Sequence, residues 1–262
     1  MTILTRSMRV VEAELVVYRR TWRGTVISSF VNPVLFLSAM GLGLGSLVDS
    51  SGADLGMSYL TFVASGLMAA TAMQAGASEG AFPVMAGIKW RKEFHATITT
   101  PLDPADIVYG RFLWSIIRLA FILVVFAVIS VLFGALEIGP ALLAVPPGIL
   151  TGVAFTTVVT AFTVTREDEQ SLSTLFRFAI TPLFLFSGTF FPISELPGYL
   201  QKLAYVTPLF HGVELVRKVA LPGVDQTALT SIPIWVHVVY LLAMTAVGLA
   251  LAARWLDRRL RP

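Results

Sequence analysis

The sequence predicts an all-α, polytopic membrane protein with six transmembrane helices in a single domain, residues 1–262. Hydrophobic residues make up 56% of the chain, and its mean hydropathy is +0.79. Charged residues account for 13%, compared with about a quarter in soluble domains. The apolar runs are long enough to cross a bilayer, and the few charges lie between them rather than along one face of a helix or strand. The polar shell that a soluble core of this size would need is therefore missing.

Residues 1–23 are predicted to form an amphipathic helix in the membrane interface. Arginine and glutamate side chains fall on one side of this helix, and the aromatic rings of the other side suit the level of the lipid headgroups. The apolar side recurs at helical spacing and consists of Met8, Val11, Leu15, Tyr18 and Trp22. A cytoplasmic helix packed on a partner protein would show the same pattern, and the two interpretations are compatible.

Six apolar runs follow, and each is predicted to span the membrane. Pro33 is expected to kink the first span and Pro182 interrupts the fifth, because proline removes a backbone hydrogen bond. Glu79 in the second span would be costly if it faced lipid, so it either lines a polar path or lies at the cytoplasmic interface. The predicted spans are residues 24–48, 58–86, 107–133, 141–163, 172–191 and 234–255.

Two connections between the spans are long enough to have structure of their own. Residues 87–106 are strongly charged and are expected in water or against another protein. Residues 192–233 hold apolar pieces that are too short to cross, which suits an external re-entrant helical hairpin. Most Lys and Arg residues, 16 of the 19, lie near the two termini, near the 87–106 loop or at residues 166–177. The positive-inside rule therefore predicts that both termini and the 87–106 loop are cytoplasmic, which requires an even number of spans.

No enzymatic motif occurs in the sequence, so no catalytic residue is assigned. The chain has no cysteine, its three histidines lie outside any H-E-x-x-H zinc pattern, and it has no phosphate-binding P-loop. No metal site and no cofactor are therefore expected in this chain. The positions of the basic residues favour membrane orientation over nucleic-acid binding. If the protein drives transport with ATP, the ATPase, with its ATP and magnesium, is a separate subunit.

Two stretches resemble a known family. The segment FHATITTPLDPADIVYG, residues 94–110, resembles the cytoplasmic loop after the second span in permease subunits of type-2 ABC exporters. The segment FSGTFFPISELPGYLQKLAYVTPLFHGVELVR, residues 186–217, resembles the end of the fifth span and the external hairpin of the same family. The pattern is most similar to nodulation-factor, antibiotic-resistance and polysaccharide export permeases, and the similarity in span order covers essentially the whole chain.

The resemblance implies a permease that moves a hydrophobic, drug-like or lipid-linked substrate outward across the cytoplasmic (inner) membrane. It implies that residues 8–22 form an interfacial connecting helix and that residues 89–99 form a coupling helix seated in a groove of an ABC ATPase. It also implies that residues 192–217 form short external helices that dip into the outer leaflet. The expected partners are two ATPase subunits, a second permease copy or a paralogue, and membrane lipids.

The residues expected to couple the ATPase to the permease lie in and around the 87–106 loop. Trp90 and Phe94 are four residues apart, so on a helix they would share one face that could anchor in a partner pocket. The simpler interpretation of the charges in this loop is a positive-inside loop without a partner. The full predicted set is Lys89, Trp90, Arg91, Lys92, Glu93, Phe94, His95, Thr100, Pro101, Asp106 and Gly110.

A substrate path is expected to involve Glu79 and an aromatic group near the outer leaflet. This group would otherwise form an interfacial belt. The alternative function is an ion- or proton-coupled secondary transporter or channel that works without an ATPase, for which Glu79 and Arg118 are the candidate intramembrane charges. No internal repeat supports that alternative, and Glu79→Gln is expected to have a mild effect. The aromatic group is Phe184, Phe186, Phe190, Phe191 and Tyr199.

Overall fold

The computed structural model describes residues 3–50, 57–223 and 230–261, and the regular secondary structure within them is entirely helical. In this part of the chain, five helical segments are long and apolar enough to cross a membrane. They are α1 (Ile3–Leu37), α3 (Tyr59–Met85), α5 (Pro104–Leu132), α6 (Ile138–Leu143) joined to α7 (Val145–Val164), and α12 (Ile234–Leu260). The prediction of an all-α membrane protein is confirmed, whereas the described residues provide five candidate spans and not six.

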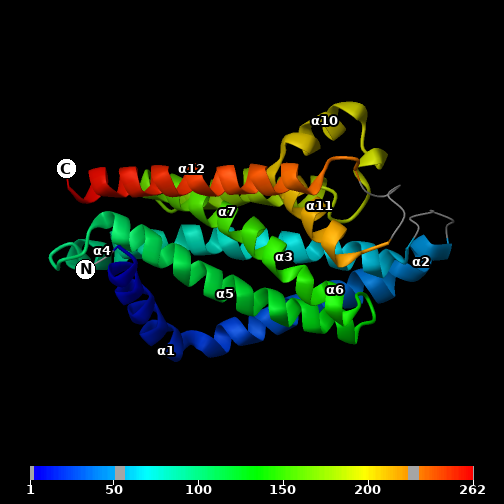
Figure 1. Ribbon diagram of the computed structural model, residues 1–262, viewed down its shortest axis with the longest axis horizontal. Coiled ribbons are helices and arrows are strands. Elements are labelled where there is room, and N and C mark those ends of the chain that lie inside the picture. The colour runs from blue at the N-terminus through cyan, green and yellow to red at the C-terminus, as the bar shows by residue number, and fades with distance from the viewer. Residues whose placement is uncertain (1–2, 51–56, 224–229, 262) are drawn as a thin grey trace.

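The long helices lie roughly side by side, so the molecule has two ends (Figure 1). Both termini and the short α4 (Glu93–Thr97) gather at one of them, which we call the terminal end. The other end, which we call the far end, holds α2 (Gly45–Ser50), α6 and α10 (Gly198–Val206). The 87–106 loop and the two termini therefore lie on the same side of the bundle.

α1 joins the predicted interfacial helix and the predicted first span into one continuous helix. The helix has no break after residue 23, and Figure 1 shows instead that the ribbon of α1 changes direction along its length. Pro33 does not end the helix either, because the backbone stays α-helical to Leu37 and then widens into the π-helix η1 (Ser38–Leu44). The connection between the first two predicted spans falls mostly on residues 51–56, which lie outside the described residues.

The predicted fifth span, residues 172–191, differs most from expectation. Three short pieces replace it: α8 (Gln170–Leu175), the π-helix η3 (Phe176–Ile180) and α9 (Thr181–Phe186). The wide turn comes directly before Pro182, where the Thr181 N–H donates to the Phe176 carbonyl oxygen five residues back. Such a turn leaves room for a proline ring. Because the helix ends at Phe186, this segment is too short to count among the five candidate spans.

The predicted hairpin at residues 192–233 contains the 3-10 turn η4 (Ile193–Glu195), α10 and α11 (Pro208–Ala220), while residues 224–229 lie outside the described part. α10 stands away from the bundle in Figure 1, whereas α11 packs against α3, α7 and α12. The start of α11 is fixed by Pro208 and by the Thr207 hydroxyl, which accepts a hydrogen bond from the Phe210 N–H at 3.4 Å. The hairpin therefore reaches into the bundle.

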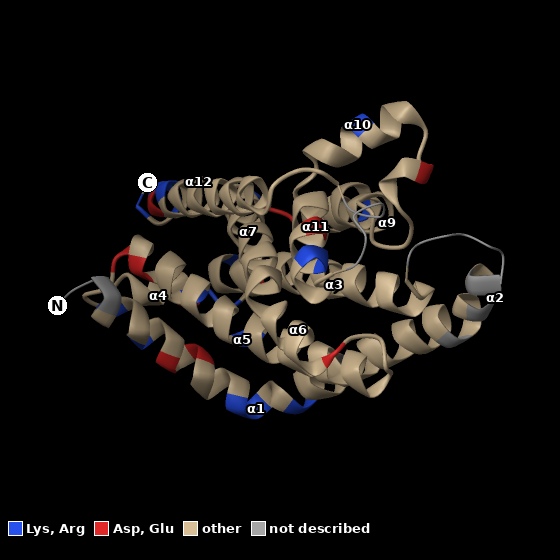
Figure 2. Cartoon of the chain, turned by 45° about the vertical axis from the view of Figure 1, so that its right-hand side comes forward, with Lys and Arg blue, Asp and Glu red and all other residues tan. Residues whose placement is uncertain are grey.

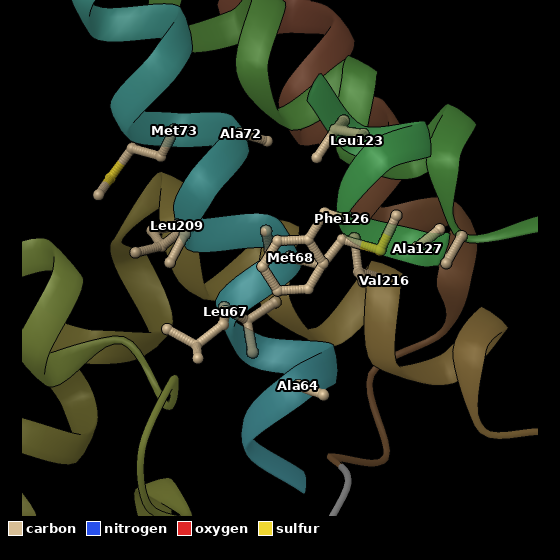
Figure 3. Packing of buried hydrophobic residues seen from close by; sticks show 14 of the residues in the cluster. Ala64, Leu67, Met68, Ala72, Met73, Leu123, Phe126, Ala127, Leu209 and Val216 are labelled. Carbon is tan, nitrogen blue, oxygen red and sulfur yellow. The ribbon is translucent and has the colours of Figure 1, made fainter. Parts of the chain in front are cut away.

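The main apolar core lies where α3 meets α5 and α11 (Figure 3). α3 combines alanines with larger side chains, so the neighbouring helices approach closely while leucine and methionine fill the space between them. Phe126 of α5 is 1% exposed and lies near Met68 of α3. The residues labelled in the figure are Ala64, Leu67, Met68, Ala72, Met73, Leu123, Phe126, Ala127, Leu209 and Val216.

α3 and α7 approach one another closely at two glycines. A β-carbon added to Gly76 would lie 2.1 Å from the carbonyl oxygen of Gly152, and one added to Gly152 would lie 3.0 Å from the carbonyl oxygen of Ala72 in α3. The Gly76 position therefore has no room for a side chain, and the Gly152 position is tight. Helix association in lipid depends on close packing, because lipid tails are as apolar as the helices themselves. These glycines therefore hold α7, and the loop that follows it, in place against α3.

Candidate functional site

The loop between α3 and α5 forms part of the terminal end and carries the predicted coupling residues. α3 passes into the π-helix η2 (Ala86–Trp90), which is closed by the Arg91 N–H donating to the Ala86 carbonyl oxygen at 2.8 Å. Lys92 then adopts a left-handed conformation with φ of 52°, which is uncommon for a residue with a side chain. Helix α4 starts after it as a separate helix. α5 begins at Pro104 behind a capping box made by Asp103 and Asp106.

The structure separates Trp90 from Phe94. Because Lys92 interrupts the helix between them, their four-residue spacing does not place them on one face. Trp90 is 47% exposed, whereas Phe94 is 4% exposed and packs with Ile88 and Ile107 in a small core. The prediction of a shared anchoring face is therefore wrong: Phe94 holds the loop in place from inside, and Trp90 faces outward.

The other predicted coupling residues divide in the same way. Asp106 is buried and accepts a hydrogen bond from the Asp103 N–H at 2.9 Å. Gly110 is also buried, and a β-carbon there would lie 2.5 Å from Val10 of α1. These two residues fix α5 and α1 rather than face a partner. Glu93 is half-buried, and the exposed members are Lys89, Arg91, Lys92, His95, Thr100 and Pro101.

Phe94→Ala is expected to loosen this loop. The ring lies against Gly87, where an added β-carbon would be 2.5 Å from it, so truncation leaves a cavity beside the backbone of η2. We expect a loss of about 3 kcal/mol in stability, at the lower end of the range for phenylalanine truncation. Thermal unfolding of the purified chain measures this loss. Trp90→Ala is the matched control and should melt close to the unchanged chain, while a Phe94→Ala chain that does the same would contradict the buried role.

An acidic loop, residues 165–169, lies against the predicted coupling residues. The Lys89 ammonium donates to the Glu167 carbonyl oxygen at 2.5 Å, and the Trp90 indole Nε1 donates to Glu169 Oε1 at 2.8 Å. Asp168 accepts hydrogen bonds from the backbone N–H and the hydroxyl of Ser171. The bond from the Ser171 backbone is the main cause that lowers the pKa of Asp168. The surface around Trp90 is thus built from two loops.

Both ends of the chain are tied to the start of α5. Arg6 donates to Asp103 Oδ2 at 3.0 Å, and Arg261 donates to Asp103 Oδ1 at 2.9 Å. The hydrogen bond from Arg261, together with the charges of both arginines, holds the pKa of the Asp103 carboxyl below its usual value. Exposed pairs of this kind add little stability. They nevertheless show that the two termini and the 87–106 loop form one continuous surface.

A buried charge cluster joins α1, α3 and α5 behind this surface. Glu79 of α3 pairs with Arg118 of α5, and Arg111 of α5 pairs with Glu14 of α1. Arg111 Nη2 also lies 4.0 Å from Glu79 Oε2, and these two side chains are only 7% and 8% exposed. Two carboxylates thus face two guanidinium groups, so the cluster is neutral as a whole. Buried charges need such pairing.

A polar groove opens between α1 and α3 beside this cluster. Its volume is about 260 Å³, and Arg118 reaches across it to donate to the Thr25 hydroxyl at 3.3 Å. Polar side chains on helices of membrane length are costly against lipid, so this lining indicates water, a polar ligand or another protein in the groove. Glu79 is one of the residues that line the groove. The polar lining residues are Thr25, Ser29, Asn32, Thr71, Gln74, Ser78, Glu79 and Arg118.

The aromatic residues of the predicted substrate path form a separate group. Phe184 makes edge-to-face ring contacts with Phe36 and Phe190, with centroid distances of 5.9 and 5.0 Å. These residues follow η3 towards the far end, whereas Glu79 lies near the terminal end of α3. The structure therefore does not bring the predicted path residues together. The remaining members are Phe186 and Tyr199, which are exposed, and Phe191, which is half-buried.

Sequence reasoning missed the acidic loop and the Glu14–Arg111 pair as parts of the site. Glu14 and Arg111 are 97 residues apart, and Trp90 and Glu169 are 79 residues apart, so no local spacing rule connects them. One signal was present in the sequence. A carboxylate inside a span needs an opposite charge nearby, and Arg118 is a cation within another span.

A comparison with protein families adds evidence that does not depend on this geometry. The ABC-2 type transporter family matches residues 7–221. The chain belongs to the ABC-2 type transporter family. It is 29% identical over 254 residues to Nodulation protein J of Rhizobium leguminosarum bv. viciae, covering 93% of this chain and 95% of that protein. Nodulation protein J of Rhizobium leguminosarum bv. trifolii is 31% identical over 223 residues (80% and 83%). The inner membrane transport permease YadH of Escherichia coli (strain K12) is 22% identical over 201 residues (76% and 77%).

Membership of the ABC-2 type transporter family confirms the resemblance to type-2 ABC permeases. The protein is a multi-pass membrane subunit of an ABC transporter, and ABC-2 permeases work with a separate ATP-binding subunit. This result favours the ABC transporter over the ion- or proton-coupled transporter or channel that the sequence left open. It also agrees with the expectation that the catalytic site for ATP lies on another chain.

Proposed function

We propose that this ABC-2 permease is an exporter subunit that moves a hydrophobic, drug-like or lipid-linked substrate outward across the cytoplasmic membrane. Two permease copies, or one copy and a paralogue, would work with two ATPase subunits, and ATP and Mg²⁺ would bind to the ATPase. The observation that carries this proposal is the exposed, charged surface at the terminal end, which buried ion pairs connect to the polar groove.

The distribution of charge favours a cytoplasmic location for the terminal end. Figure 2 shows Lys and Arg gathered along α1 and at the end of α12, and scattered singly near the far end. By the positive-inside rule, the side rich in these residues is cytoplasmic. The relative from Escherichia coli is named an inner membrane transport permease. With both termini on one side, residues 170–186 would form a sixth crossing of roughly 25 Å at 1.5 Å per residue, which is close to the thickness of the bilayer core.

The ATPase would dock on a set of exposed residues at the terminal end, which we call the coupling surface: Lys89, Trp90, Arg91, Lys92 and His95, with the acidic loop beside them. Trp90 is its largest exposed apolar side chain, and tryptophan is enriched among the residues that dominate binding energy at interfaces. Charges of both signs surround the indole ring. Such a surface suits a partner with an apolar pocket and a charged rim.

Movement of the coupling surface would reach several helices together. Lys89 and Trp90 end the helical segment that begins with α3, and their hydrogen bonds attach the acidic loop that leads into α8. The buried cluster connects α3 to α5 and α1. Packed helices respond as rigid elements, so closure of the ATPase would shift α1 against α3 and change the width of the groove. The polar part of the substrate would pass there, and the far-end aromatic residues would guide its apolar part.

The test is purification of the tagged chain in mild detergent, followed by identification of the proteins that accompany it and an ATPase assay. Trp90→Ala is compared with Trp235→Ala, which changes another exposed tryptophan, 66% exposed, at the start of α12. We expect a P-loop ATPase to accompany the unchanged chain and Trp235→Ala. We expect at least a tenfold weaker association for Trp90→Ala, because a central aromatic anchor contributes on the order of 1.4 kcal/mol or more.

Two results would count against this proposal. Equal ATPase recovery with all three chains would place the docking site away from Trp90. A well-folded chain that never retains an ATPase would overturn the coupling surface altogether. Direction is measured separately in inside-out vesicles, where an exporter accumulates substrate only when ATP is supplied outside the vesicle. Loss of substrate from the lumen in that assay would contradict outward transport.

A further inference from the structure

We propose that Arg259, in the last turn of α12, positions the acidic loop and so completes the coupling surface. α12 ends at the terminal end of the bundle (Figure 1), and the residues that Arg259 binds are 93 and 95 positions away in the sequence. The inference rests on the proposed function and deepens it, because it assigns a positioning residue to the surface on which the ATPase would dock.

The side chain of Arg259 binds the point where α7 becomes the acidic loop. Its Nη1 donates to the carbonyl oxygen of Val164, the last residue of α7, and to that of Arg166 at 2.7 Å. The last carbonyl groups of a helix lack partners within the helix, and an arginine near them satisfies them and interacts favourably with the helix dipole. Arg259 does so from a different helix, so it fixes the direction in which the chain leaves α7.

Both acceptors of Arg259 are main-chain atoms. Within the described part of the chain, the arginine of this turn that forms ion pairs is Arg261, whereas Arg259 forms none. Arg259 therefore acts on the backbone of the acidic loop and not on the charges of its side chains. The neighbouring Arg258 carries the same charge but is exposed, and among the described residues it makes no hydrogen bond to the loop.

α12 itself is held tightly enough to fix the place of Arg259. A β-carbon added to Gly248 of α12 would lie 2.5 Å from the Thr157 hydroxyl oxygen of α7, so the two helices approach closely there. Leu260, which follows Arg259, is 6% exposed and belongs to the small core behind the 87–106 loop. Arg259 is thus carried by a helix that packs against both parts of the coupling surface.

The acidic loop is held at two places. Arg259 binds its start, while Lys89 and Trp90 bind Glu167 and Glu169 further along. Loss of Arg259 removes the donor from two carbonyl oxygens at the end of α7, and these oxygens then gain by turning toward water. The loop moves with them, and Glu169 no longer holds the Trp90 indole in place. The surface offered to the ATPase becomes less well defined.

The position of the acidic loop can be measured with a fluorophore, because the chain contains no cysteine. Glu167→Cys, which keeps the backbone oxygen that Lys89 binds, is labelled with bimane in the full chain in lipid nanodiscs. A tryptophan in contact with bimane quenches it, and the same chain with Trp90→Phe gives the fluorescence without that quenching. We expect Arg259→Gln to lose most of the quenching. Arg259→Lys should keep most of it, since a lysine can also donate to carbonyl oxygens, as Lys218 does.

Arg258→Gln is the matched control, because it removes the same charge from the same turn and leaves the bonds to the acidic loop intact. Association with the purified ATPase is measured on unlabelled chains with the same substitutions at these two positions. We expect about fivefold weaker association for Arg259→Gln, which is the size of effect that losing one hydrogen bond produces. Arg258→Gln should bind the ATPase as the unchanged chain does.

Three results would overturn the inference. Equal quenching in Arg259→Gln and Arg258→Gln would show that Arg259 does not position the loop. Loss of quenching in Arg259→Lys as well would point to a general disturbance of the fold. Loss of quenching without weaker ATPase association would show that docking does not depend on the loop. Failure of the proposed function gives a different result, because the unchanged chain itself would then bind no ATPase.

Discussion

Gly76→Ala is expected to prevent the permease from forming a stable bundle. The new β-carbon would lie 2.1 Å from the Gly152 carbonyl oxygen and 2.8 Å from the Gly152 carbonyl carbon. These are backbone atoms, so no side-chain rotation relieves the overlap, and α3 and α7 must move apart. The expected cost is at or above about 3 kcal/mol, the upper end for overpacking. Size-exclusion chromatography and thermal unfolding in detergent measure the loss as an aggregated or early-melting chain.

Gly24→Ala is the matched control for this experiment. A β-carbon at Gly24 has nothing within 4 Å, and alanine is the better helix former. The control chain should therefore be as stable as the unchanged protein or slightly more so. If Gly76→Ala eluted and melted like Gly24→Ala, the close approach of α3 and α7 would be wrong, and so would the position of the acidic loop that α7 carries.

Glu79→Gln is expected to destabilise the chain strongly, contrary to the mild effect that the sequence alone suggested. The substitution leaves Arg118 and Arg111 facing a single carboxylate, that of Glu14. Removing one partner of a buried pair costs about 3–5 kcal/mol. We expect roughly the lower limit of that range, because the Arg118 side chain is 23% exposed and can reach water. Thermal unfolding in detergent measures the effect.

The double variant Glu79→Gln/Arg118→Gln tests whether the loss of stability comes from breaking the Glu79–Arg118 pair. Removal of both charges restores neutrality, so the double variant should be more stable than the sum of the two single losses predicts. Glu12→Gln is the matched control, since Glu12 pairs with Arg9 on the exposed side of α1 and surface pairs contribute about 0–1 kcal/mol. Strictly additive losses in the double variant would show that Glu79 and Arg118 do not act as a pair.

The sequence predicted the long helices well, because an apolar run long enough to cross the bilayer core indicates a membrane-spanning helix. It did not predict their number. The segment before Pro182 is apolar, but a proline and a wide turn divide it into pieces, and hydropathy does not reveal helix type. The continuous α1 was missed for a related reason. Arg19, Arg20 and Arg23 look like the end of an interfacial helix, although arginine is a good helix former and the backbone continues through them.

The site was less predictable than the fold. The position of the 87–106 loop followed from its charges. The different roles of Trp90 and Phe94 depend on the left-handed backbone at Lys92, and the sequence does not predict this conformation because lysine rarely adopts it. The Glu14–Arg111 pair and the Arg217 contacts with α3 join residues that are 97 and more than 150 residues apart. Such pairings depend on which helices become neighbours. A single sequence therefore shows that a buried charge needs an opposite charge, but it does not show which residue supplies it.

The shared carboxylate of Asp103 has a practical consequence for protein engineering. Since Arg6 and Arg261 both bind it, the two ends of the chain leave the bundle side by side. A tandem polypeptide of two copies would therefore need no added crossing between them, because both ends lie on the same side of the bundle. In such a tandem each half can carry its own substitution, so one copy of Glu79 or Trp90 can be changed while the other is kept.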